Sequence, residues 1–147
     1  MNIALKWMFA WFAASILTFL LASVFHSQFV LLGLTQINID IPMANWIGMT
    51  LGDILGLSLS YGIVIALAFF LCFGTCTLVS HYWRILPLWC YPLLAALTIA
   101  IMLAAMQPLL NVTLIAGARS QLGFIFQCLA GLLGGYLFIR LQTGSKQ

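Results

Sequence analysis

The chain has 147 residues, of which 65% are hydrophobic and only 5% are charged, and its formal net charge is +3. A water-soluble domain typically carries about 25% charged residues, so this chain lacks the polar side chains that would cover a soluble core. The composition therefore predicts an all-α integral membrane protein with the lipid bilayer as its surroundings. The few basic residues form no cluster with aromatic residues, so no nucleic-acid partner is expected.

Four apolar runs are each long enough for a membrane-spanning helix, which needs roughly 20 residues. We expect a single transmembrane domain over residues 1–147, built as a four-helix bundle. The spans are expected at about 5–25, 53–80, 86–107 and 121–139, with extracytoplasmic loops at about 26–52 and 108–120.

The first span begins with Lys6 and continues as an apolar run, as a secretory signal does. This run is longer than the roughly 7–15 apolar residues of a cleaved signal, so an uncleaved anchor is expected. Trp7 and Trp11 lie near its start, where aromatic residues mark the membrane surface.

The first loop contains both acidic residues of the protein, Asp40 and Asp53, and no lysine or arginine. Pro42 is favourable in the first turn of a helix because its missing N–H would be unpaired there. We therefore expect a short helix from Pro42 to about Met49 within this loop. Thr50 stands three residues before Asp53 and resembles a helix cap, so the second span is expected to begin near Asp53.

The basic residues indicate the orientation. With both termini on one side, that side carries Lys6, Arg84, Arg140 and Lys146, whereas the other side carries Arg119 alone. Cytoplasmic loops are enriched in lysine and arginine, so both termini are expected in the cytoplasm. The low charge and short loops favour a bacterial inner membrane.

The three formal charges expected on the far side are Asp40, Asp53 and Arg119. An arginine beside a low-dielectric surface is costly unless it is paired, and its planar group suits a carboxylate. Our hypothesis is that Arg119 pairs with Asp53 and clamps the first loop onto the fourth span. Alternatively, these charges line a docking pocket for a ligand or protein, with His26 as a nearby polar contact.

The cysteines lie in or at the ends of apolar runs, where a cysteine usually acts as a small hydrophobic residue. Cys72 and Cys76 share one helix face, but no histidine, aspartate or glutamate in that span completes a metal site. No nucleophile and base stand at a recognisable spacing. We therefore predict no metal, no cofactor and no catalytic residues.

The fourth span carries small residues four apart, which allow two helix backbones to approach closely in lipid. These residues are Ala130, Gly131, Gly134 and Gly135. They predict a packing face, either within the chain or against another membrane protein. In the same span, Gln127 is expected to hydrogen-bond to Thr75, Thr98 or a backbone carbonyl.

These patterns favour a non-catalytic accessory, assembly or stabilising subunit that acts through helix–helix and loop contacts. Its partner would be another membrane protein or a second copy of itself. Two other functions stay open from the sequence. One is a small oligomeric transporter or channel, and the other is a membrane enzyme that acts on a lipid or quinone.

Overall fold

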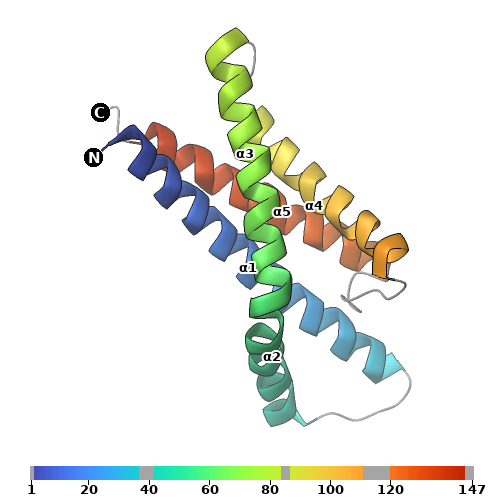
Figure 1. The fold of residues 1–147 in the computed structure, drawn as a ribbon. Helices are drawn as coiled ribbons and strands as arrows, with labels where there is room; N and C mark the ends of the chain where they lie inside the picture. The colour runs from blue at the N-terminus through green and yellow to red at the C-terminus, as the bar shows by residue number, and fades with distance from the viewer. Residues whose placement is uncertain (1, 37–41, 84–86, 111–119, 145–147) are drawn as a thin grey trace.

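The computed structural model describes residues 2–36, 42–83, 87–110 and 120–144, and within these ranges the chain is helical and contains no strand (Figure 1). The elements are α1 (Ile3–Gln36), α2 (Met43–Leu57), the π-helical segment η1 (Ser58–Gly62), α3 (Ile63–Trp83), α4 (Cys90–Leu110) and α5 (Gln121–Thr143). Because α2, η1 and α3 follow one another without a break, they form one rod, and the described chain consists of four long helices.

Three of these helices are long and apolar enough to cross a membrane. They are Ile3–Thr35, Asn45–Tyr82 and Gln121–Thr143, and the shorter apolar helix Cys90–Ala105 belongs to α4. The prediction of a helical chain with the composition of a membrane protein is therefore confirmed.

The first predicted loop, residues 26–52, differs from the observed structure. Helix α1 continues to Gln36 and α2 already begins at Met43, so most of this segment is helical. Residues 27–36 include no proline, and Gly33 alone costs a helix only about 1 kcal/mol. With 34 residues, α1 is about 51 Å long at 1.5 Å per residue, well beyond a hydrocarbon core of about 30 Å.

The separate short helix predicted from Pro42 to Met49 is also wrong, because α2 runs on into the second long helix. Pro42 precedes the first turn, where its carbonyl accepts from the backbone N–H groups of Asn45 and Trp46. Thr50 does not cap a new helix. Its hydroxyl donates to the carbonyl of Trp46 at 2.9 Å, a bond made inside a continuing helix.

Helices α1 and α5 lie side by side and run antiparallel (Figure 1). Early residues of α1 meet late residues of α5: Lys6 Nζ donates to the carbonyl of Gln142 at 2.7 Å, and Thr18 Oγ1 to that of Ala130 at 3.4 Å. Helix α4 packs along the other side of α5, while α3 crosses α1 and contacts α4. The bundle is therefore organised around α5.

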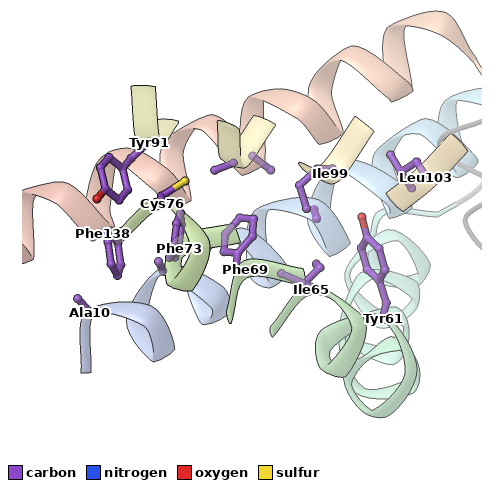
Figure 2. Close-up of a cluster of buried hydrophobic side chains, with 14 residues drawn as sticks. Ala10, Tyr61, Ile65, Phe69, Phe73, Cys76, Tyr91, Ile99, Leu103 and Phe138 are labelled. Atoms are coloured by element: carbon purple, nitrogen blue, oxygen red, sulfur yellow. The ribbon is translucent and has the colours of Figure 1, made fainter. Parts of the chain in front are cut away.

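The apolar core joins all the long helices, as Figure 2 shows. The rings of Phe73 and Phe138 stack with centroids 4.1 Å apart, and Tyr91 stacks on Phe138 at 5.9 Å. On α1 the core positions Ala10 and Ala14 are small, which allows close helix approach. Aromatic stacking thus joins α3, α4 and α5 at one level along the bundle.

Candidate functional site

A polar contact joins α1 to α2 in the first half of the chain. Ser27 on α1 is fully buried, and its hydroxyl lies 2.7 Å from Oδ2 of Asp53 on the half-buried face of α2. An ionisable residue in contact with a buried polar group of an otherwise apolar helical bundle is a candidate functional position. This contact therefore identifies the first candidate site.

The Ser27 hydroxyl has one proton but two acceptors within reach, because it also lies 3.1 Å from the carbonyl of Ser23. The Ser27 hydroxyl therefore lies between the backbone of α1 and the side chain of Asp53 on α2.

The structure brings one further predicted site residue to this contact. His26 is buried on α1 and interacts electrostatically with Asp53. Asp40 and Arg119 lie outside the described residues, so the pairing of Arg119 with Asp53 stays a prediction.

A second polar contact lies deeper in the bundle and joins three elements. Gln127 on α5 is 1% exposed; its Nε2 donates to the carbonyl of Ala22 at 2.9 Å, and its Oε1 accepts from the Tyr61 hydroxyl at 3.1 Å. Tyr61 belongs to η1, and π-helical turns often occur at functional sites. A backbone carbonyl was among the predicted partners of Gln127, whereas Tyr61 was not predicted.

The small residues of α5 lie inside the molecule and face two helices. A Cβ added at Gly131 or Gly135 would meet α4, at 3.0 Å from the Ala95 carbonyl oxygen and 2.7 Å from Pro92 Cα respectively. A Cβ at Gly134 would meet α1 at Thr18 Oγ1, and Ala130 is completely buried. The α5 glycines therefore let α1 and α4 approach the backbone of α5 from two sides.

A second set of glycines, which we call the α2 glycine face, consists of Gly48, Gly52 and Gly56. All three are exposed, and among the described residues no heavy atom outside their own helix lies within 4 Å of a Cβ built at any of them. Their spacing of four residues places them on one side of α2. Gly48, Gly52 and Gly56 thus have the four-residue spacing of the α5 glycines, but none of the described residues packs against them.

The cysteines show no sign of a metal centre in the described part of the chain. All four are free thiols, and no group of three or more histidine, cysteine, aspartate or glutamate residues occurs within these ranges.

Comparisons of the chain with protein-family models, with curated proteins and with solved structures returned no match.

Proposed function

We propose that the protein is a non-catalytic membrane subunit that assembles with, or stabilises, another membrane protein. The observation that carries this proposal is the open α2 glycine face. Glycines four residues apart let helix backbones approach closely in lipid, and within this chain the α5 glycines are used for that purpose. The α2 glycine face offers the same contact to a helix from outside.

The side chains next to this face strengthen the proposal. Ile47, Leu51 and Leu55 each precede one of the glycines, and Leu55 is 75% exposed. They form an apolar ridge beside a groove of small residues. Helices pack by inserting such ridges into the grooves of a neighbour. The surface of α2 is thus suited to a partner helix in both its shape and its hydrophobicity.

Lipid contact alone does not require these glycines. Glycine costs a helix about 1 kcal/mol relative to alanine, and lipid chains cover an alanine or leucine equally well. The three glycines of α2 therefore destabilise the helix by a few tenths to about 1 kcal/mol each, and close packing of a partner helix against them would offset this destabilisation. The pattern therefore favours a protein partner over lipid.

The proposal includes a location. The excess of basic residues on the side of the termini supports cytoplasmic ends, and the short connections support a bacterial inner membrane. In that orientation α2 lies towards the extracytoplasmic side. The partner helix would then dock in the outer half of the membrane.

The test is the mass of the complex extracted in mild detergent at native expression level, with its components identified. We expect a stoichiometric foreign protein with the wild-type chain and its loss with Gly52→Leu. Gly33→Leu is the matched control, because Gly33 is an exposed glycine on α1 with equally open surroundings. A complex that survives Gly52→Leu unchanged would contradict the proposal. So would a monomer or a pure homo-oligomer, the latter pointing instead to a channel or transporter.

A further inference from the structure

The exposed side of α5 ends in an aromatic residue and a charged residue that contact each other. Tyr136 and Arg140 stand one helical turn apart, and both are exposed. The Tyr136 hydroxyl accepts from Arg140 Nε at 2.7 Å, and the central guanidinium carbon of Arg140 lies 5.3 Å from the centre of the Tyr136 ring. The guanidinium group is therefore held against the tyrosine instead of extending freely from the helix.

This contact leaves most hydrogen-bond donors of the two side chains available. A guanidinium group has five N–H donors, and Tyr136 uses the one on Nε. Within the described ranges, Nη1 and Nη2 of Arg140 make no hydrogen bond, and the Tyr136 hydroxyl still has its own proton to donate. A planar set of donors of this kind matches the oxygens of a phosphate group.

The acidic residues of the chain belong to a different part of the molecule. They are Asp40 and Asp53, and Asp40, which lies outside the described residues, precedes α2 in the sequence. Asp53 contacts Ser27, about 31 Å along α1 from Lys6, whereas Lys6 lies at the end of α5 that carries Arg140. Figure 1 shows α2 away from the end at which α1 begins and α5 finishes. The anion that pairs with Arg140 is therefore expected to come from outside the chain.

The position of Arg140 along α5 suits the surface of a membrane. Helix α5 is one of the helices long and apolar enough to cross a bilayer. From Gln121 to Arg140 it rises about 29 Å, close to a hydrocarbon thickness of about 30 Å. The exposed side chains that precede Tyr136 on the same face are apolar, namely Leu122, Ile125, Leu129 and Leu133. Acyl chains can therefore cover this face while a headgroup reaches Arg140.

We propose that Tyr136 and Arg140 bind the phosphodiester group of an anionic phospholipid. Nη1 and Nη2 of Arg140 and the hydroxyl of Tyr136 donate to the phosphate oxygens, and the acyl chains lie along α5. A zwitterionic headgroup also carries an ammonium group, and Asp53, the acid that the structure describes, is far from Arg140. An anionic headgroup is therefore favoured. This site rests on the membrane location of α5 and not on the α2 glycine face.

Lys6 provides a matched control at the same end of the bundle. Its Nζ donates to the carbonyl of Gln142, which follows Arg140 by two residues and so lies about 200° further around the helix. Lys6 and Arg140 are therefore on different sides of α5. Lys6→Gln removes one positive charge, as Arg140→Gln does, but leaves Tyr136 and Arg140 unchanged.

The experiment measures lipid binding to the full chain in mild detergent by native mass spectrometry. The probes are phosphatidylglycerol and phosphatidylcholine with the same acyl chains. We expect wild type and Lys6→Gln to bind phosphatidylglycerol about fivefold more tightly than phosphatidylcholine. Arg140→Gln should lose this preference, and Arg140→Lys should keep only part of it, because an ammonium group is a point charge without the planar donor set.

Three results would contradict the proposal. The first is equal affinity of wild type for the two lipids, and the second is a preference that persists in Arg140→Gln. The third is loss of the preference in Lys6→Gln as well, which would show that net charge alone attracts the lipid. Arg140 and Lys6 are replaced at the end of the bundle, and the melting transition of each variant confirms that it is folded.

A second arm tests the source of the phosphate and the role of the tyrosine. Inorganic phosphate added in excess should not displace phosphatidylglycerol from wild type, because it lacks the acyl chains that cover α5. Displacement would make free phosphate the ligand and overturn the lipid proposal. Tyr136→Phe keeps the ring but removes the hydroxyl, so the preference for phosphatidylglycerol should weaken. An unchanged preference in this variant would exclude the Tyr136 hydroxyl from the site.

Discussion

Two glycine faces with the same spacing have opposite surroundings in this molecule. On α5, Gly131 and Gly135 lie against the backbone of α4, and Gly134 lies against α1. On α2, Gly48, Gly52 and Gly56 are exposed. The comparison teaches that a small-residue motif in a membrane helix predicts close packing without specifying the partner. Only the tertiary structure separates a seam that is already filled from one that is open.

The strongest test of this comparison is Gly135→Leu. The nearest atoms to an added Cβ include backbone atoms of Pro92 and Tyr91, at 2.7 and 2.9 Å, and backbone cannot rotate away as a side chain can. We expect the free energy of unfolding to fall by about 3 kcal/mol or more through overpacking. Reversible unfolding in mixed micelles measures it. A loss below about 0.5 kcal/mol would mean that α4 does not pack here.

The second largest effect on stability is expected for Gln127→Leu, which removes the polar contacts of α5 with Tyr61 and Ala22. The variant leaves the Tyr61 hydroxyl and the Ala22 carbonyl without their side-chain partner, at a cost of about 1–3 kcal/mol. Tyr61→Phe combined with Gln127→Leu should cost less than the sum of the single changes. Strict additivity in this double-mutant cycle would show that the two side chains do not interact.

A smaller effect is expected for Ser27→Ala on the α1–α2 contact. The change removes the donor to Asp53, and interhelical hydrogen bonds in membranes contribute about 0.6 kcal/mol on average. We expect Ser27→Ala to lower the free energy of unfolding by about 1 kcal/mol. The decrease should be smaller in an Asp53→Asn background, where the acceptor is neutral. The same unfolding assay at fixed pH measures both. Equal losses in the two backgrounds would argue against the carboxylate as the acceptor.

The smallest effect is expected for Gly52→Ala. Because open space surrounds the position, the added methyl group meets no neighbour and only the backbone entropy changes. The isolated chain should become more stable by up to about 1 kcal/mol, whereas Gly131→Ala on α5 should be destabilising. Unfolding of the two variants side by side gives the comparison directly. Destabilisation by Gly52→Ala would show that the α2 glycine face is covered within the chain.

The sequence could predict what depends on composition and local pattern. Hydropathy indicated the helical membrane architecture, and α5 begins at Gln121 after Ser120, whose hydroxyl accepts from the N–H of Gly123. The spacing of the α5 small residues predicted close packing but left the partner open. The positions of the long helices and of the small residues on α5 follow from the lengths of the apolar runs and from residue spacing alone.

The helix boundaries near α2 were only partly predictable. Pro42 correctly indicated a helix start, because α2 begins at Met43, but Thr50 suggested a second start that does not exist, since its hydroxyl bonds back to Trp46 within one helix. The false boundary also divided Gly48 from Gly52, so the α2 glycine face was not recognised, although its spacing was present in the sequence.

Contacts between distant elements could not be predicted from one sequence. The contact of Ser27 with Asp53 was not predicted, whereas the pairing of Arg119 with Asp53 stays a prediction because Arg119 lies outside the described residues. Tyr61 reaches Gln127 from a π-helical turn, which has no reliable sequence signature. Such contacts depend on helix rotation and crossing, which hydropathy does not encode.

The antiparallel pairing of α1 with α5 has a consequence for biogenesis. Helix α1 precedes α5 in the chain and packs most extensively against it, so Lys6 can reach Gln142 only after α5 has been synthesised. Until then Thr18 has no α5 carbonyl to bond, and the α1 backbone at Ala22 has no glutamine to contact. The bundle around α5 therefore closes only after the contacts between α1, α2 and α3 have become possible.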